Sequence, residues 1–476
     1  MRKAFALTLA ALLGGCQLAP PHERPALPTA SEFPAYAGDV ALGQRAVDIG
    51  WRDFFADARL ESLVAAALER NRDLAIAVAR IEEARGLYRI QAADHLPTLG
   101  VSGDVTRSRT PGAATGIPGV GNVTDTRYSI GVGVTGFELD FWGRVKNLSE
   151  AARWQYLATI EAQRAFRLTL IRDVASAYFA AREADERIAL AEATVRSRQE
   201  GLRIAKRRLD AGVTSALDFR QAESLLTQAE TELAGLRLAK AQSDNFLAVL
   251  TGGPIPADLP APLPLAQQKN GTTITAGLPS ELMVARPDIL AAEERLRAAR
   301  ANIGAARAAF FPSISLTGNL GFASTDLGNL VGNDGLSWSF GPTISLPIFD
   351  WGRRKGNLTV AEAREDIAVA DYEGTVQQAF REVADALAGR RWLAEQVAAQ
   401  LRATEAQRQI AFLARTRYRE GVANYLEVLD AERNLFTAEQ ALIQVRRSEL
   451  DNLVSLYVAL GGGALEATAS GNAPGS

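Results

Sequence analysis

The sequence predicts an α+β membrane protein built from two copies of one unit, each with a pair of strands and a long helical hairpin. The first observation is a repeat: "LDAGVTSALDFRQAESLL" (209–226) returns as "YREGVANYLEVLDAERNLF" (418–436), with Gly212 matching Gly421. The second is a set of alternating, strand-like stretches, and the third is a pair of long tracts without proline. An internal repeat of this size constrains the fold more than any local pattern does.

The repeat extends over most of the chain. "NRDLAIAVARIEEARGLYRIQAADHLPTLGVSG" (71–103) aligns with 285–318, so that Pro97 matches Pro312 at an offset of 215. "DFWGRVKN" (140–147) resembles "DWGRRKGN" (350–357) at an offset of 209. The predicted organisation is a Pro-rich N-terminal linker (16–55), a first copy (56–253), a middle linker (254–278), a second copy (279–463) and a flexible C-terminal tail (464–476).

Each copy contains two stretches that alternate as strands do. They are predicted at about 97–108, 126–140, 312–324 and 336–348. In the last stretch Trp338, Phe340 and Ile344 share one face, while small and hydroxyl residues share the other. The pattern is typical of a barrel wall between lipid and water, where a tilted strand needs ~9–11 residues. It equally fits a soluble hairpin with one face on a core, and the strands alone leave both open.

The longest part of each copy is helical. Helical hairpins are predicted over 143–250 and 352–460, with their tips at Gly212 and Gly421. The first arm has about 68 residues, roughly 100 Å at 1.5 Å per residue. A coiled-coil seam recurs every seven residues in this arm. Its members are Ile188, Val195, Leu202 and Leu209, and the weaker second seam has Val397, Thr404, Ala411 and Tyr418.

Four strands are too few to close a membrane barrel, because the smallest spanning barrels have about eight. Unpaired strand edges are not tolerated in lipid. We therefore expect several copies of the chain to assemble into a ring. Two copies would supply eight strands and three would supply twelve. The sequence does not distinguish a ring of two copies from a ring of three.

The N-terminus has the pattern of a targeting segment. Arg2 and Lys3 precede an apolar run that is shorter than the ~20 residues of a spanning helix. The run ends at "LLGGC", which resembles a bacterial lipobox, so residues 1–15 are expected to be a lipoprotein signal peptide and Cys16 the acylated mature N-terminus. An ordinary signal peptide with a chance cysteine is the alternative. Gln17, where inner-membrane lipoproteins usually have Asp, suggests the outer membrane.

Composition excludes several function classes. The net charge of −3 gives no reason to expect a nucleic-acid partner. Two histidines and one cysteine cannot assemble a Cys/His metal cluster, and no metal or cofactor is predicted. The sequence lacks a nucleophile elbow and a phosphate loop, so an enzyme is not expected. The carboxylates are spread along helices, where charge usually means a solvated face.

Together these elements resemble the TolC-like outer-membrane efflux proteins, and most closely the lipoprotein (NodT-like) subunits of RND-type efflux systems. The resemblance is carried by "RPDILAAEERLRAARANIGAARAAFFPSISLTG", "FDWGRR" and "YREGVANYLEVLDAERNLF", in that order. It implies a homotrimer with a twelve-stranded outer-membrane barrel and a periplasmic α-barrel. It also implies two partners, a periplasmic adaptor (membrane fusion) protein and an inner-membrane RND-type pump.

The resemblance also assigns roles to residues at the hairpin tips. Residues at both tips would dock the adaptor; these are Arg208, Leu209, Gly212, Val213, Thr214, Arg417, Tyr418, Gly421, Val422 and Asn424. Just beyond the second tip, a gate would close the periplasmic aperture; its residues are Leu426, Glu427, Asp430 and Arg433. The first-copy counterparts of Asp430 and Arg433 are Gln221 and Ser224, so the charged pair exists in only one copy. An ordinary solvated pair on one helix is the alternative.

The expected function is therefore the exit duct of a tripartite efflux pump, which passes small molecules such as drugs through a gated, passive pore. A channel for type I protein secretion is the nearest alternative. A structural lipoprotein with an acyl anchor, a coiled coil and no pore is a more distant one. That alternative explains Cys16 and the helices but not the duplicated strands.

Overall fold

The computed structural model describes residues 18–33, 43–114, 121–269, 273–275, 277–332 and 334–468. Cys16 and the signal peptide 1–15 lie outside the described residues, as does the C-terminal tail beyond residue 468. The chain divides into two compact units. Unit 1 is Met1–Pro25, Ile81–Thr159 and Ala292–Tyr372, and unit 2 is Ala26–Arg80, Ile160–Ala291 and Glu373–Ser476.

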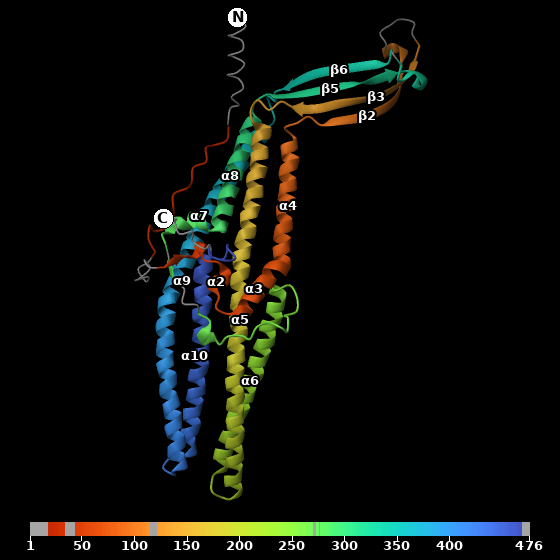
Figure 1. The fold of residues 1–476 in the computed structure, drawn as a ribbon. Helices are drawn as coiled ribbons and strands as arrows, with labels where there is room; N and C mark the ends of the chain where they lie inside the picture. Colours follow the sequence, from red (N-terminus) through yellow and green to blue (C-terminus); the bar gives the residue numbers. More distant parts are fainter. Residues whose placement is uncertain are drawn as a thin grey trace, which may run out of the picture. The chain divides into compact units, whose positions relative to one another are not determined.

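Unit 1 contains a four-stranded antiparallel sheet with the order β2-β3-β5-β6 (Figure 1). Its strands are β2 (Leu99–Thr110), β3 (Val123–Glu138), β5 (Ser313–Ser324) and β6 (Leu336–Ser345). The sequence placed them at about 97–108, 126–140, 312–324 and 336–348. The short helices η3 (Gly112–Ala114) and η6 (Leu327–Asn329) follow β2 and β5. Strands β2 and β6 form the two edges of this sheet.

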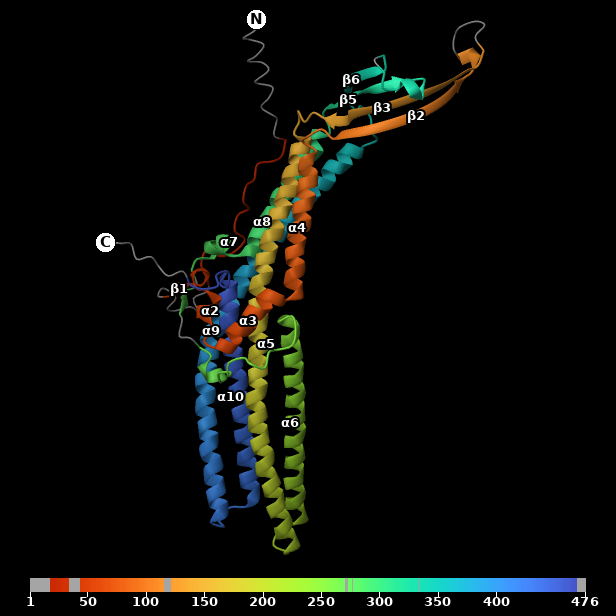
Figure 2. The same ribbon diagram turned by 45° about the vertical axis from the view of Figure 1, so that its right-hand side comes forward.

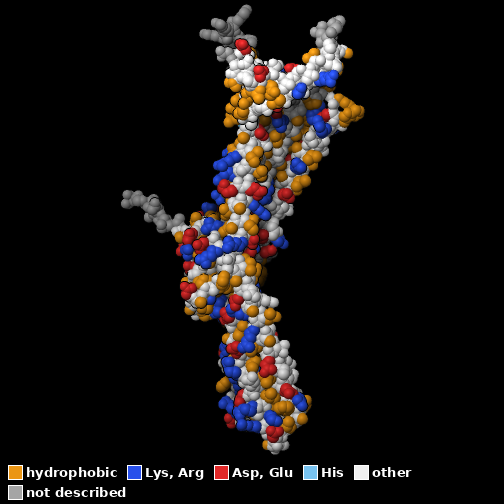
Figure 3. All heavy atoms as spheres, turned by 90° about the vertical axis from the view of Figure 1, so that its right-hand side faces the viewer, with side chains coloured by type: hydrophobic (Ala, Val, Ile, Leu, Met, Phe, Trp, Pro, Cys, Tyr) orange, Lys and Arg blue, Asp and Glu red, His pale blue; other side chains and the backbone are white. Residues whose placement is uncertain are grey.

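The sheet exposes large apolar side chains. Trp338, Phe340 and Ile344 alternate along β6 and are 73%, 66% and 70% exposed in the single chain. Figure 3 shows a group of hydrophobic side chains over the strands of this unit; hydrophobic and charged side chains are mixed along the helices. An apolar face of this kind on a sheet requires a lipid or protein covering.

The other elements of unit 1 are helical. They are the last part of α4 (Arg72–Ala93), the first part of α5 (Arg144–Asp210), most of α8 (Pro287–Ala308) and the first part of α9 (Arg353–Arg419). The described leader lies against α8, where Arg307 donates to the carbonyl oxygen of Leu18 at 3.2 Å. Glu293, which is 2% exposed, bonds His22 at 3.1 Å and Arg24 at 2.8 Å. Burial lowers the pKa of His22, although the hydrogen bond to Glu293 opposes this shift.

Unit 2 contains most of two helical hairpins, which Figures 1 and 2 show side by side. The first joins α5 to α6 (Ala216–Leu250), and the second joins α9 to α10 (Tyr425–Ala459). Smaller elements complete the unit; they are β1 (Gln44–Arg45), η2 (Ala46–Asp48), α2 (Trp51–Phe54), α3 (Ala58–Arg70), η4 (Leu265–Gln267), β4 (Ile274–Thr275), η5 (Pro279–Glu281) and α7 (Leu282–Ala285). Strand β1 pairs in parallel with β4, so the N-terminal and middle linkers meet. Among the described helices, none has a stretch apolar enough and long enough for a membrane span.

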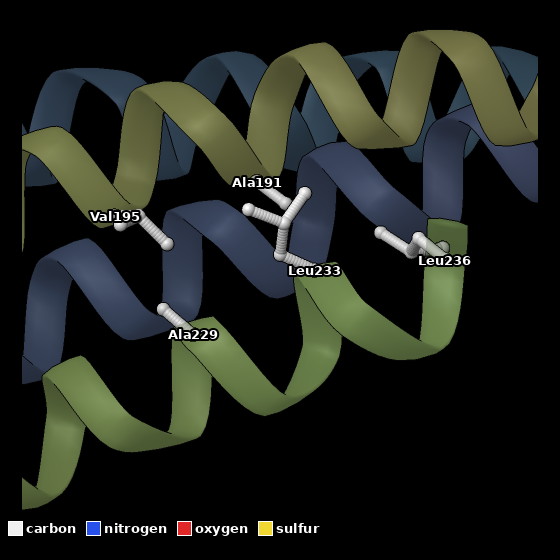
Figure 4. Close-up of a cluster of buried hydrophobic side chains, with 5 residues drawn as sticks. All are labelled: Ala191, Val195, Ala229, Leu233 and Leu236. Carbon is white, nitrogen blue, oxygen red and sulfur yellow. The ribbon is translucent and has the colours of Figure 1, made fainter. Parts of the chain in front are cut away.

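The arms of each hairpin pack through small apolar residues. In the first hairpin, Ala191 and Val195 of α5 contact Ala229, Leu233 and Leu236 of α6 (Figure 4). In the second, Ala411 and Ala414 of α9 pack with Val428 and Ala431 of α10. The seam predicted in the first hairpin includes Val195, and the weaker second seam includes Ala411. These side chains are almost fully buried, so each pair of arms has an apolar seam even though the helices as a whole are not hydrophobic.

A buried carboxylate fixes the middle linker to the hairpins. Asp57 is 0% exposed and caps α3 by accepting from the backbone N–H of Arg59 at 2.9 Å. Its other oxygen accepts from the Tyr178 hydroxyl at 2.6 Å, the Gln268 amide at 2.7 Å and the Leu263 N–H at 3.0 Å. One side chain thus joins α3, α5 and the linker.

Candidate functional site

Both hairpin tips turn by the same backbone device. Gly212 and Gly421 have positive φ values of 71° and 73°, which glycine adopts without the steric penalty of a side chain. In the first tip, Gly212 donates to Leu209 O at 2.9 Å and Val213 donates to Arg208 O at 2.8 Å. This pair of bonds is a Schellman motif.

The second tip repeats the pattern. Gly421 donates to Tyr418 O and Val422 donates to Arg417 O, both at 3.0 Å. The glycines are therefore helix terminators, whatever else the tips bind. Val422 is 67% exposed, and Val213 at the first tip is 65% exposed, so an apolar side chain is presented at each turn.

The returning helices start differently. Ser215 and Asp218 form a reciprocal capping box at the start of α6, and Thr214 also donates to Asp218, at 2.5 Å. Asn424 caps α10 by accepting from the Glu427 N–H at 3.0 Å. The Glu427 carboxylate lies 3.1 Å from Arg417 across the second tip. Glu427 therefore has a cationic partner within its own hairpin.

The two tips of one chain also contact each other. Arg208 of α5 hydrogen-bonds the Tyr418 hydroxyl, and its guanidinium lies 5.6 Å from the centre of that ring. Tyr418 packs on Tyr425, with ring centroids 5.2 Å apart. Gly201 leaves room for the Tyr425 hydroxyl, because a Cβ there would collide with it. The docking residues proposed on separate hairpins thus form one surface.

All four predicted gate residues lie on α10, and three of them face α6, whereas Glu427 turns towards Arg417 of α9. Leu426, Asp430 and Arg433 line a cleft of about 230 Å³. The remaining lining residues are Gln221, Ser224, Leu225 and Leu429. The structure therefore brings Asp430 and Arg433 together with Gln221 and Ser224, their first-copy counterparts.

The charged pair of the predicted gate lies within one helix. Arg433 pairs with Asp430 three residues earlier, and both side chains are more than half exposed. Asn434 also donates to Asp430, at 3.2 Å. In the single chain this is the ordinary solvated arrangement. A link to a neighbouring helix would require Arg433 to exchange partners.

Sequence reasoning missed the charges that are partly or fully buried among the hairpin helices. Arg187 of α5 bonds Gln440 of α10, and it also lies 2.9 Å from Glu183 and 3.1 Å from Glu232. Arg198 is 8% exposed and donates to Leu225 O at 2.6 Å. The expectation that carboxylates along the helices lie on solvated faces does not hold for Glu183, which is 9% exposed. In sequence these residues resemble their solvated neighbours, so only the fold reveals them.

The model of the family described as "Outer membrane efflux protein" matches residues 63–253 and 278–462. This chain belongs to the outer membrane efflux protein family. The two matched segments of this efflux protein include both helical hairpins, and hence both tips and the gate residues.

Individual relatives are similar over nearly their whole length. The solvent efflux pump outer membrane protein SrpC of Pseudomonas putida is 44% identical over 95% of this chain and 96% of its own. Outer membrane protein OprJ of Pseudomonas aeruginosa is 44% identical over 96% of this chain and 95% of its own. The crystal structure of the open state of the Neisseria gonorrhoeae MtrE outer membrane channel superposes with a TM-score of 0.87, at 40% identity over 96% of this chain and 100% of MtrE. This efflux protein is thus an outer-membrane channel rather than a member of an enzyme family.

Proposed function

We propose that this protein is the exit duct of a tripartite efflux pump and passes small molecules such as drugs to the exterior. The pore is passive, trimeric and gated at its periplasmic end. The observation that carries the proposal is a sheet with two free edges joined to two long hairpins, in a chain of the efflux family. Neither alternative from the sequence, protein secretion or a structural lipoprotein, has a comparable observation in its favour.

The sheet edges support a ring of chains. Within the described residues, the outer edges of β2 and β6 pair with no other strand. Their N–H and C=O groups cannot remain unpaired in lipid, because each lost hydrogen bond costs several kcal/mol there. Pairing β6 of one copy with β2 of the next removes every edge. Three copies then form a barrel of twelve strands, and their hairpins form a periplasmic α-barrel.

The two-copy organisation and the assigned domains fit this assembly. The order helix, two strands, hairpin occurs twice along the chain, and the family matches in two segments. The linker strands β1 and β4 and the buried Asp57 would belong to an equatorial belt around the tunnel. A periplasmic adaptor and an inner-membrane RND-type pump would meet the tips at the far end.

The leader supports acylation at Cys16. Arg307, at the end of α8, holds the carbonyl of Leu18, and β5 begins at Ser313. Only Gln17 separates Leu18 from Cys16. Two extended residues span at most ~7 Å, so the leader would deliver an acylated Cys16 close to the base of the strands. Lipid chains on Cys16 would there enter the inner leaflet of the outer membrane.

Native mass spectrometry and planar-bilayer recording of the purified mature protein test this proposal. We expect particles of three chains, each beginning at Cys16 and carrying acyl groups, that conduct in small and rarely open steps. Correctly assembled trimers that never conduct would contradict the channel. Conducting particles of unmodified chains would contradict only the lipid anchor.

The docking role of the tips gives a separate prediction. Val213→Asp combined with Val422→Asp places a carboxylate at each exposed apolar turn. Both valines are about two-thirds exposed, so the fold tolerates the change. We expect at least a fourfold loss of drug resistance in the native host, because an apolar contact with the adaptor would have to bury a charge. Bilayer conductance should stay the same.

The matched control is Val213→Leu combined with Val422→Leu, which keeps the surface apolar and should keep resistance. Full resistance in the aspartate variant, at equal protein levels, would show that these turns do not carry the adaptor.

A further inference from the structure

The junction between β3 and α5 is fastened by a tryptophan. Trp142 donates its indole N–H to the carbonyl oxygen of Pro312 at 2.8 Å. Its ring stacks on Phe311, with centroids 4.7 Å apart and planes inclined by 21°. The backbone continues the contact, because Leu139 donates to Ile314 O at 2.8 Å. Trp142 of the first copy thus packs on the segment that leads into β5 of the second copy.

The matching junction of the second copy is packed differently. The ring of Trp351 meets its neighbour Phe349 edge-on, with centroids 4.5 Å apart, and within the described residues no ring of the first copy stacks on it. Trp351 matches Trp142 at the offset of 209, yet it is 89% exposed. Ile348 and Phe349 beside it are 90% and 71% exposed. Asp350 shapes this turn by accepting from the N–H groups of Gly352 and Arg354, both at 3.1 Å.

The backbone of this turn is unusual. Trp351 has φ of 57° and is the one non-glycine residue in the described chain with a positive φ. A bulky residue avoids this region unless its surroundings hold it there, and such residues cluster where a surface has a function. The turn holds an apolar ring out from the protein.

The repeat identifies the surface that would receive this ring. At the offset of 215, Phe311, Pro312 and Ile314 correspond to Leu96, Pro97 and Leu99. Leu96 and Leu99 are 71% and 72% exposed. The surface equivalent to the one beneath Trp142 is therefore present, apolar and uncovered.

Trp351 cannot reach this surface in its own chain. Leu99 begins β2 and Trp351 follows β6, and β3 and β5 lie between these two edge strands. Three inter-strand spacings of ~4.8 Å separate the edges by about 14 Å. In a ring, however, β6 of one copy lies beside β2 of the next.

We infer that Trp351 packs on Leu96 of the next copy of this chain and donates its indole N–H to the carbonyl of Pro97 there. The inference rests on the proposed ring and names a residue contact that closes it. Ile348 would donate its backbone N–H to Leu99 O of the same neighbour, as Leu139 does to Ile314. Trp142 uses both a packing partner and a hydrogen-bond acceptor, and we expect Trp351 to need the same two. Leu96 and Pro97 of a second copy supply both, so the partner of Trp351 is a second copy rather than lipid.

Photo-cross-linking tests the contact. The photoreactive amino acid p-benzoylphenylalanine is placed at Trp351 in the full-length protein, and the purified trimer is irradiated. We expect cross-linked dimers and trimers on a denaturing gel, with the cross-link in the tryptic peptide 90–107, which contains Leu96 and Pro97. The same probe at Trp142 is the matched control. It should cross-link within one chain, to the peptide 308–353, without forming dimers.

A second measurement separates contact from folding. Trp351→Ala should yield at least tenfold more monomer than the parent after heating in detergent, whereas Trp351→Phe should recover part of the loss. Leu96→Ala should add little to Trp351→Ala, because both remove the same contact.

Intact trimers in which the Trp351 probe labels only detergent or lipid, or in which Trp351→Ala is as heat-stable as the parent, would overturn the inference and leave the channel standing. Absence of trimers in the unmodified protein would instead contradict the proposed function.

Discussion

Replacing Asp430 and Arg433 together by alanine is expected to convert a rarely open channel into one that conducts for most of a bilayer recording. The two residues line the cleft between α10 and α6, close to the tip of the second hairpin. In the proposed trimer they would hold neighbouring helices together, once Arg433 exchanges its own-helix partner for one across the aperture. Alanine removes the link without disturbing either helix, because both side chains are exposed.

The magnitude follows from the exposure of the pair. An exposed ion pair contributes ~0–1 kcal/mol, so three pairs would hold the aperture with at most about 3 kcal/mol. Since 1.4 kcal/mol is a factor of ten, removing ~2 kcal/mol raises the open population roughly thirtyfold. A gate this weak suits its proposed role, because adaptor docking could open it without any other source of energy.

A matched control exists on the neighbouring helix. Arg220 and Glu223 of α6 form an exposed i,i+3 pair at 2.6 Å, similar to the gate pair in type and spacing. Replacing both by alanine should leave conductance unchanged. Equal currents from the parent and the Asp430→Ala/Arg433→Ala variant would show that the gate does not lie at this cleft.

The tips and the hairpins show what local pattern can predict. Gly212 and Gly421, each followed by a valine, predicted the end of a helix, because a Schellman turn depends on only a few consecutive residues. The structure places positive φ at both glycines. The seam at Val195 was also predictable, since a seven-residue period selects one face of a helix.

The partners of charged residues were not predictable in the same way. Glu427 was expected to belong to the gate, yet its carboxylate lies beside Arg417 across the tip. The sequence showed that Trp142 and Trp351 correspond, but not that one is packed and the other exposed. Such differences arise from which strand lies at an edge of the sheet, and this information is absent from the local pattern.

Asp57→Ala is expected to loosen the middle linker strongly. The carboxylate of Asp57 accepts four hydrogen bonds and is fully buried, so alanine leaves the donors on Tyr178, Gln268 and Leu263 without this acceptor. Each buried donor left unpaired costs ~1–3 kcal/mol. Three such donors sum to about 3–9 kcal/mol, and the lower part of this range matches the ~3–5 kcal/mol lost on breaking a buried ion pair.

The dependence on pH gives an independent signature of the same carboxylate. Burial acts to raise the pKa of Asp57, but the hydrogen bonds from Tyr178, Gln268, Leu263 and Arg59 outweigh it, so this pKa lies below its usual value. The stabilisation is therefore complete above the ordinary carboxyl pKa near 4 and is lost as the pH falls through the lowered folded value. Asp57→Asn should remove this acid-induced loss, since an amide does not titrate.

Protease accessibility of residues 254–269 and thermal melting of the helices measure the effect. We expect Asp57→Ala to be cleaved in the linker at protease levels that leave the parent intact, and to melt at a lower temperature. Asp57→Asn should be intermediate between Asp57→Ala and the parent. Its amide keeps one acceptor oxygen, but its NH₂ group faces donors that the second carboxylate oxygen had accepted from. Asp258→Ala is the control, since Asp258 is exposed on the same linker and should resemble the parent. Parent-like cleavage and melting of Asp57→Ala would mean that the linker is held by its apolar contacts alone.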